Sequence, residues 1–366
     1  MELKIFNRDL ELIGILEAFT SLRWVRRYHK AGEFELHCPL TSNTIKLLGK
    51  DNIIYIGSDE AGFINNRQLG IERDGSEKLI VKGKFLTGYT SRRINWDKII
   101  FEGRAETLMY NLVSINCINP KNTDRKINNL ELGLNNNLPY KISYQNSYGE
   151  LDVCLESISL SCDYGFKIEF DYIRKKLVFK VYEGVNRTIN QSAIAPCLFS
   201  RDFENIIKQD YTDSIDNYKN TCLIAGAGED DLRKKTSIGN YRGLDRYELF
   251  VDARDLSDKE KINDVEKIIP WNRYEAMLKQ KGSEKLGEYK KVETFDSEIN
   301  LRSNIKYKED FDLGDIVTCY DPKWGVTIDT RVTEIEEVYE EKGMEVKVTF
   351  GNNVPTLIDK IKAKMR

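Results

Sequence analysis

The feature that most constrains the fold is a series of short segments in which apolar and polar residues alternate. Phe34 and Leu36, for example, alternate with glutamates, which is the pattern of a strand with one buried and one exposed face. Asp74-Gly75 adds a hairpin signal, because glycine accepts the positive φ of a tight turn. Short strands at this spacing predict that residues 1–95 form a first β domain, a small barrel or a sandwich.

The middle of the chain, residues 96–185, has a different period. Apolar residues recur three and four positions apart over 105–113 and over 151–162, which predicts two amphipathic helices. Alternating apolar residues on both sides of a polar turn at 172–175 then predict a two-stranded ribbon. The Asn- and Lys-rich stretch 119–137 is typical of a loop. We expect an α/β domain of two helices and a ribbon.

The last region, residues 186–366, returns to the strand pattern. It carries a charged stretch near 257–289 that predicts a helical insertion, since Ser257 and Glu260 fit a capping box and Pro270 is expected to break the helix. The fold class is therefore α+β and β-rich, with a β domain at each end and an intervening α/β domain; the family resemblance described below implies that both β domains are small barrels. No short-period repeat is visible, and the sequence alone does not show whether the β-rich ends are a duplication. Further strands are expected at 292–299, 316–320, 326–339 and 344–350, and a short basic helix at 356–366.

Composition excludes several classes of protein. The 366 residues suit two or three domains, and 10% aromatic residues supply core material that disordered chains lack. The net charge of −3 offers no basic surplus for a phosphate backbone, so we expect no specific nucleic-acid binding. No apolar run approaches the roughly 20 residues of a membrane helix, and the first residues lack a signal-peptide pattern. We expect synthesis in the cytoplasm, which the family resemblance described below implies is that of a bacterium, and no membrane insertion.

The supply of catalytic and metal-binding residues is small. His29 and His37 are the only histidines, and a turn at Lys30–Gly32 would place His29 beside it and His37 near Trp24, too far apart to share a metal or a proton. The seven cysteines form no C-x-x-C pair, which favours reduced thiols in apolar surroundings over disulfides or zinc. We therefore assign no catalytic residue, metal or cofactor.

A glycine-rich segment, Gly226-Ala227-Gly228-Glu229-Asp230, follows the apolar run 222–225. Such a loop can hold phosphate on its backbone N–H groups when a helix follows. Here two acidic residues stand where the anion would bind, and no helix pattern follows. A flexible β-hairpin loop is the favoured interpretation.

Basic residues interleave with aromatic ones in one predicted strand, where Arg23, Arg26 and Arg27 alternate with Trp24 and Tyr28. An oligonucleotide-binding barrel has this character. A charged barrel face or a subunit contact, where arginine and aromatic residues are enriched, explains it better. Acidic residues are too abundant to mark the carboxylate pair of a glycosidase. The composition favours a binding or assembly protein over an enzyme.

Several segments resemble, in order along nearly the whole chain, one family of siphophage tail-hub proteins. The first is Leu22-x-Trp24-x-Arg26-Arg27-Tyr28 with Gly32-x-Phe34-x-Leu36, and the most specific runs from Gly243 to Ser257. One departure is Asp230 or Asp231 where the family has a further loop glycine, which affects only the shape of that loop. The motif residues that the resemblance assigns to assembly or fold are Trp24, Gly32, Phe34, Gly226, Gly228, Asp245, Arg246, Asp252, Gly314 and Asp315.

The resemblance implies a function. The family is similar to the baseplate hub of contractile tails and R-type bacteriocins, and to the N-terminal part of tail-associated lysins. It implies a homotrimer at the distal end of the tail tube, in which two similar barrels per subunit make a ring of six that joins a six-fold tube to a three-fold spike. The implied partners are a tail-tube or distal tube-initiator protein, the central spike, and tape-measure and baseplate-wedge proteins. The implied location is the tail baseplate of a virion or phage-like particle.

Two other functions stay open at this point. A cell-wall polysaccharide or peptidoglycan hydrolase of a tail tip is motivated by the acidic residues, although the chain ends at Arg366 with no appended hydrolase, from which we expect a separate spike protein. A β-barrel module that binds oligonucleotide or host glycan is motivated by the Arg-Trp-Tyr strand. The sequence does not distinguish a phage, a prophage remnant and a bacteriocin.

Overall fold

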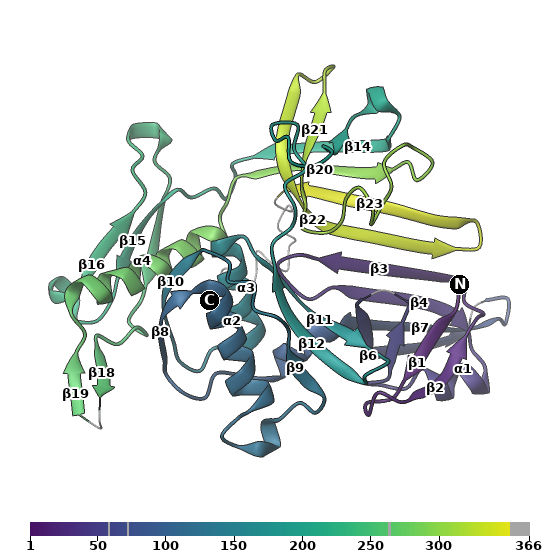
Figure 1. Cartoon of the computed structure of the whole chain (residues 1–366), viewed down its shortest axis with the longest axis horizontal. Helices are drawn as coiled ribbons and strands as arrows, with labels where there is room; N and C mark the ends of the chain where they lie inside the picture. The colour runs from purple at the N-terminus through teal and green to yellow at the C-terminus, as the bar shows by residue number, and fades with distance from the viewer. Residues whose placement is uncertain (58, 72, 263–264, 352–366) are drawn as a thin grey trace.

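The computed structural model describes residues 1–57, 59–71, 73–262 and 265–351. Its largest element is a thirteen-stranded sheet built from both β-rich ends of the chain (Figure 1). The α/β middle lies at the centre of the view, beside the strands from the start of the chain, and a lobe projects to the left. The predicted β-rich α+β class is confirmed.

The first β unit, β1 to β7, has the strand order β3-β4-β7-β6-β5-β1-β2. The predicted alternation holds in β4, which buries Phe34 and Leu36 and turns its glutamates outward. The helix α1 was not predicted, and it begins with a reciprocal cap between Thr41 and Thr44. The elements are β1 (Leu3–Phe6), β2 (Leu12–Leu16), β3 (Ser21–Arg27), β4 (Glu33–Pro39), α1 (Ser42–Leu47), β5 (Ile53–Tyr55), β6 (Ala61–Ile71), β7 (Glu77–Phe85) and the 3₁₀ turn η1 (Leu86–Arg92).

The middle layer confirms both predicted helices and the ribbon. Apolar faces of α2 and α3 pack on the three-stranded sheet and share a core with the first unit. Within the stretch 119–137, predicted as a loop, β9 pairs in parallel with β12. The elements are β8 (Ile99–Arg104), α2 (Ala105–Val113), η2 (Ser114–Ile118), η3 (Thr123–Arg125), β9 (Leu130–Leu132), β10 (Lys141–Asn146), α3 (Leu151–Cys162), β11 (Gly165–Asp171) and β12 (Lys176–Tyr182).

The second β unit contains the strands expected near the C-terminus and its own core of buried residues. The helix predicted at 356–366 lies outside the described residues. The elements are β13 (Leu198–Phe199), η4 (Arg201–Phe203), β14 (Ile206–Ser214), β20 (Val292–Ile299), β21 (Ile316–Asp321), β22 (Val326–Glu340) and β23 (Gly343–Gly351).

The lobe is inserted between β14 and β20, and here one prediction was wrong. The stretch after Ser257 is a hairpin, β18 and β19, and the helix α4 begins only after Pro270. Proline lacks an N–H and disfavours helix in the residue before it, so it starts this helix instead of interrupting one. The hydroxyl of Ser257 accepts from the N–H of Lys259 in a turn, not in a helix cap. The elements are β15 (Thr221–Ala225), η5 (Asp230–Leu232), β16 (Lys235–Ile238), η6 (Gly243–Asp245), β17 (Glu248–Asp252), β18 (Lys259–Ile262), β19 (Val265–Ile268) and α4 (Trp271–Gly287).

The two β units have the same topology. In the first, neighbouring strands follow the order β3-β4-β7-β6-β5-β1; in the second, they follow β14-β20-β23-β22-β21-β13. The strands in these two series occur in matching chain order. One difference is that β1 pairs antiparallel with β5, whereas β13 pairs parallel with β21.

The register also matches between the units. One row across the first unit is Trp24, Phe34, Gly83 and Ile64. The corresponding row in the second unit is Tyr211, Phe295, Phe350 and Val332. In both units a bulge follows the last residue of the row, between Ile64 and Asn66 and between Val332 and Glu334. The structure therefore shows the internal duplication that the sequence alone did not.

The units are joined edge to edge, because β3 pairs antiparallel with the second half of β22. In Figure 1, β22 lies directly above β3. The ladder then ends at β14 on one side and at β2 on the other. Among the described strands, hydrogen bonding closes no barrel, so the two small closed barrels of the sequence analysis are not confirmed; the sheet is open and shared by both units.

Candidate assembly site

The junction of β3 and β22 places oppositely charged side chains on the exposed face of the sheet. The guanidinium of Arg23 lies 2.6 Å from the carboxylate of Glu336, and that of Arg27 lies 2.7 Å from Glu334. Arg27 also contacts Glu33 on β4 at 2.9 Å. These arginines are therefore paired with carboxylates of the same chain, which favours the charged-face interpretation of this strand over phosphate binding.

Arg26 points to the other side of the same strand and is 6% exposed. Its Nε donates to Glu60 at 2.8 Å, and Nη1 donates to the Tyr307 hydroxyl at 3.0 Å and to Asp312. Burial opposes the charge, but Tyr307, Glu60 and Asp312 together raise the pKa of Arg26 above its ordinary value. The Tyr307 hydroxyl in turn donates to the fully buried Glu337 of β22 at 2.6 Å. The network fixes both units against each other by charge-assisted hydrogen bonds.

A second cluster ties the middle layer to the same junction. Arg331 of β22 lies over the ring of Tyr28 at 4.9 Å and contacts the Asp163 carboxylate, after α3, at 2.7 Å. His29 lies beside them, 2.8 Å from the Ser159 hydroxyl of α3. Burial is the main cause that lowers the pKa of His29 to about 4. First unit, middle layer and second unit thus meet around Tyr28.

Two motif residues hold the start of β21 at this meeting point. Gly314 has a φ of +95°, and a β-carbon there would lie 2.5 Å from the Tyr28 ring, so the position requires glycine. Asp315 is 5% exposed, and its carboxylate accepts from the N–H of Val185 at 2.8 Å and from Arg187 Nε at 2.9 Å. Asp315 thereby anchors the segment that leaves the ribbon.

Three more motif residues, Trp24, Gly32 and Phe34, pack in the core of the first unit. Trp24 is fully buried and stacks on Phe34, with ring centroids 5.6 Å apart. A β-carbon on Gly32 would lie 2.3 Å from the carbonyl oxygen of Val25. A β-carbon on Gly83 would lie 2.4 Å from the Phe34 ring. These residues let the aromatic rings lie flat on the sheet.

The glycine-rich segment is the hairpin loop that the sequence favoured, between β15 and β16. A β-carbon on Gly226 would lie 2.4 Å from the Tyr274 hydroxyl, and Gly228 has a φ of +109°. The Tyr274 hydroxyl accepts from the N–H of Ala227 at 2.9 Å and donates to the carbonyl of Leu256 at 2.7 Å. The loop is therefore fastened to α4.

The remaining motif residues lie on the lobe surface. The carbonyl of Asp245 accepts from Asn220, and Arg246 contacts Glu248 at 2.6 Å. Asp252 accepts hydrogen bonds from Arg254 and Arg233, which lower its pKa. The ten motif residues thus divide among the first unit, the Tyr28 meeting point and the lobe, and the structure does not bring them together in one pocket.

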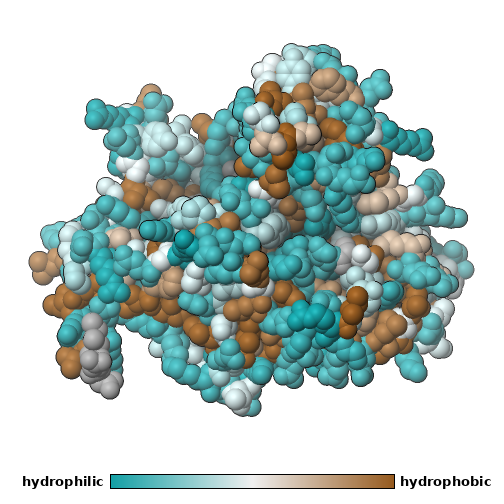
Figure 2. All heavy atoms as spheres, viewed as in Figure 1, coloured by the Kyte–Doolittle hydropathy of each residue, from teal (hydrophilic) through white to brown (hydrophobic). Residues whose placement is uncertain are grey.

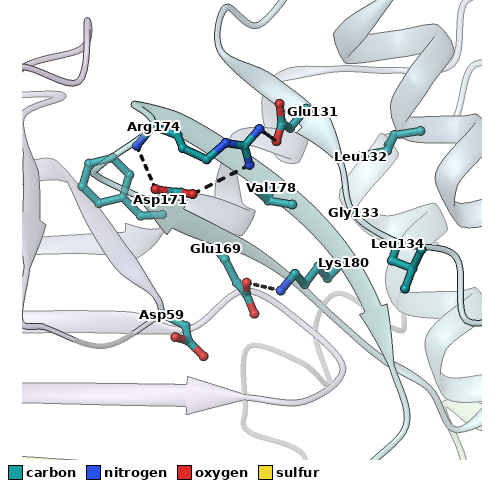
Figure 3. Close-up of a pocket in the computed structure, with 11 residues that line it drawn as sticks. Asp59, Glu131, Leu132, Gly133, Leu134, Glu169, Asp171, Arg174, Val178 and Lys180 are labelled. Carbon is teal, nitrogen blue, oxygen red and sulfur yellow. Dashed lines mark hydrogen bonds and ion pairs between the residues drawn. The ribbon is translucent and has the colours of Figure 1, made fainter.

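A shallow hollow of about 620 Å³ beside β9, β11 and β12 gathers several carboxylates (Figure 3). In Figure 3, Arg174 reaches Glu131, at 2.8 Å, and the side chains of Lys180 and Glu169 point toward each other. Their charges are therefore compensated within the hollow, so these carboxylates do not resemble the pair of a glycosidase, in which one group stays protonated and the other charged.

Histidines and cysteines lie in separate places. His37 stands opposite Ser21 and not near Trp24, three positions along from the expected place, while His29 lies beside Ser159. All seven cysteines are buried and unpaired, and burial raises the pKa of Cys117 to about 12. No group of three His, Cys, Asp or Glu side chains that would hold a metal is found in the described ranges, nor is a helix there long and apolar enough to cross a membrane.

Sequence reasoning missed the carboxylates that face the arginine strand. Their signal was present as the alternation of Glu334 and Glu336 in a predicted strand, but the pairing of that strand with β3, more than three hundred residues earlier, was not readable. It also missed exposed apolar residues on the lobe, where Figure 2 shows hydrophobic side chains at the left of the view. Exposed apolar side chains of the lobe include Leu223, Phe250, Val265, Ile268 and Trp271.

Comparison with known proteins identifies the family. Residues 2–352 match the family model described as Siphovirus ReqiPepy6 Gp37-like protein. A search of curated proteins found no match.

Three solved structures share the fold across almost the whole chain. A tail protein from Neisseria meningitidis MC58 is 14% identical, with a TM-score of 0.57 and 96% of each chain covered. The prophage tail protein gp18 from Listeria monocytogenes EGD-e is 13% identical, with a TM-score of 0.56, covering 100% of this chain and 98% of that one. The 43 kDa tail protein of prophage MuSo2 from Shewanella oneidensis is 9% identical, with a TM-score of 0.55, covering 96% and 98%. The chain belongs to the Siphovirus ReqiPepy6 Gp37-like protein family.

Proposed function

We propose that this protein is the structural hub at the distal end of a phage or phage-like tail, where three copies form a ring between a six-fold tail tube and a three-fold central spike. The observation that carries the proposal is the internal duplication, two units of matching strand order and register in one chain. Three such chains supply six similar units, which meet a six-fold neighbour, while the chain count keeps three-fold symmetry for the spike.

The chemistry of the junction suits a structural role. Its charged groups are paired across the two units and its aromatic rings are buried, which holds the two units together. Membership in a siphovirus protein family and a fold shared with three tail proteins support the same role. On this proposal the protein acts in the tail of the particle, with tube or tube-initiator, spike, tape-measure and wedge proteins as partners, and the division into domains at residues 95 and 185 stays a prediction.

Mass measurement tests the hub directly. The purified chain is measured over a range of concentrations, alone and with the spike protein encoded beside it, and assembled particles are labelled for electron microscopy. A trimer in either setting and label at the tail tip are expected, with an interface above roughly 2,000 Å². A monomer in both settings, or label elsewhere on the particle, would reject the hub.

The hydrolase alternative has no specific observation in its favour. The carboxylates Glu131 and Glu169 of the hollow are each paired with a cation, Arg174 and Lys180. Its test is turbidity: purified cell walls mixed with the protein keep their turbidity if the role is structural. Clearing that a Glu169→Gln variant abolishes would establish the hydrolase instead.

A further inference from the structure

Within one chain, β3 of the first unit pairs with β22 of the second. Because the two units match, the chain also carries an equivalent pair of strand edges that do not meet each other. By the matching register, β14 corresponds to β3, and β6 corresponds to β22. The second half of β22 pairs with β3, whereas the second half of β6, residues 66–71, has β7 on one side and no described strand on the other. Likewise, β14 pairs only with β20 among the described strands. One chain thus carries both halves of a second junction, on separate edges.

We propose that β14 of one copy pairs antiparallel with the second half of β6 of the next copy, in the register that β3 adopts on β22. This inference rests on the proposed function, because it supplies the contact between copies of the ring. In the observed junction, Glu337 stands opposite Trp24 and Ile335 opposite Arg26. The same register places Leu69 opposite Tyr211 and Arg67 opposite Asp213.

The residues on the two edges fit this pairing. Leu69 and Ile71 are 56% and 72% exposed, and an apolar strand edge left open to solvent invites pairing with another chain. Opposite them the register places Tyr211 and Gln209. An aromatic residue across from an aliphatic one, and opposite charges at Arg67 and Asp213, are favourable cross-strand pairs.

An independent observation points to the same two edges. Five buried side-chain polar atoms have no hydrogen-bond partner among the described residues, and two of these are Arg67 Nε and Gln209 Oε1. Buried polar atoms are nearly always satisfied in folded proteins. One donor and one acceptor are thus left over on the two edges, while the other three atoms lie on β3 and β20. In the inferred register the Arg67 guanidinium faces the carboxylate of Asp213, which can accept from it.

The contact is head-to-tail, because β6 and β14 are different strands. They lie seven ladder steps apart in one chain, roughly 34 Å along the sheet at about 4.8 Å per step. A heterologous contact either closes a ring or grows a filament. A ring of three copies requires that the step from chain to chain repeat the step from unit to unit, so that the ladder closes after six units.

Cysteine pairs test the register. Gln68→Cys and Thr212→Cys stand opposite each other on the outer face of the inferred junction, and directly opposed strand residues lie within the range that a disulfide spans. Mild oxidation of the two single variants mixed together is expected to give covalent dimers, and the double variant covalent trimers. The matched control pairs Gln68→Cys with Lys208→Cys, four residues along the same strand face, and is expected to stay uncrosslinked. The seven native thiols are buried and leave this background clean.

A non-covalent variant provides the second measurement. Leu69→Glu is exposed in one chain, so folding is expected to persist, while the trimer dissociation constant rises at least tenfold. Leu12→Glu, an equally exposed apolar residue on the other free edge, β2, is the control and leaves the trimer intact. The interface is wrong, although the hub proposal stands, if trimers form but the opposed cysteines do not crosslink. The same conclusion follows if Leu12→Glu breaks the trimer and Leu69→Glu does not. Absence of any oligomer, alone or with the spike protein, overturns both.

Discussion

The two β units share a ladder but fill it differently. In the first, the row Trp24, Phe34 and Gly83 sets a large ring against a bare glycine backbone; in the second, Phe350 stands where Gly83 does. The charge also changes place: the buried Arg26 has Asp213, which is half exposed, as its counterpart. Strand order and register are therefore kept, while side-chain volume and charge vary, because each row is free to exchange size between neighbours as long as the total space is filled.

The largest expected difference between the units is at Arg26 and its counterpart. Arg26→Met removes the buried cation that Glu60 and Asp312 share and leaves the buried Glu60 without it, so the free energy of unfolding should fall by about 3–5 kcal/mol. Asp213→Asn removes only a half-exposed contact with Lys291 at 2.9 Å, worth less than about 1 kcal/mol. Urea unfolding of both variants at a concentration where the chain is monomeric measures the pair. Equal losses of stability in the two variants would contradict the expectation that the buried arginine contributes more than the half-exposed aspartate.

A smaller contrast separates the body of the second unit from its lobe. Asp315→Asn weakens three hydrogen bonds to a buried carboxylate, from Arg187 and from the N–H groups of Val185 and Asp312, with an expected loss of about 1.5–3 kcal/mol. Asp252→Asn changes an exposed carboxylate paired with Arg254 and Arg233, and less than about 1 kcal/mol is expected. Thermal unfolding followed by circular dichroism compares them. A larger loss of stability from Asp252→Asn than from Asp315→Asn would show that the motif residue in the lobe contributes more to folding than the buried one.

Two glycines of the first unit should respond differently to replacement by alanine, because one is tightly packed and the other is not. Gly83→Ala places a β-carbon 2.4 Å from the Phe34 ring and 2.0 Å from the carbonyl oxygen of Phe63, so overpacking should cost about 1–3 kcal/mol. Gly70→Ala, on β6, meets nothing closer than 3.8 Å and should raise stability by up to about 1 kcal/mol. Denaturation midpoints of the two variants give the sign. A neutral Gly83→Ala would mean that the row tolerates a larger residue as the second unit does.

The smallest expected effect concerns pH, and it belongs to the first unit because the second has no histidine. With a folded pKa of about 4, His29 stays neutral where the unfolded chain, with an ordinary pKa near 6.5, takes up a proton. Stability from this residue is therefore present above pH 6.5 and lost as the pH falls, by about 1 kcal/mol between pH 7 and pH 5.5. His29→Gln should remove that part of the slope. An unchanged slope would assign the loss to other groups.

Much of the local structure was predictable, because alternation and helical period depend on near neighbours. The strand around Phe34, the helices at 105–113 and 151–162, and the hairpin at Asp74-Gly75 all follow from such patterns. The pairing of β3 with β22 did not follow, since the register of distant strands depends on partners that no local pattern names. The duplication was hidden for the same reason: Gly83 and Phe350 share a position but no side-chain property.

The charged stretch after Ser257 shows the opposite failure. Its residues satisfy a helix-start pattern, yet they form a hairpin whose partner strand lies only a few residues away. A local pattern with two solutions is decided by tertiary packing, and here Pro270 confines the helix to the residues after it. The motif residues were likewise predictable as a set, but their separation into three places was not.

The insertion between β14 and β20 has a consequence for how such a particle is varied over time. Unit one makes the same connection with the few residues from Tyr28 to Gly32, whereas unit two expands it into an entire lobe. The lobe packs on α3 and β10 of the middle layer, but its strands form separate sheets, so its exposed residues can vary without changing the hydrogen bonding of the thirteen-stranded ladder. In an assembled ring of six β units, only every second unit would carry the lobe. A protein that binds from outside would therefore find three lobes on a ring of six β units.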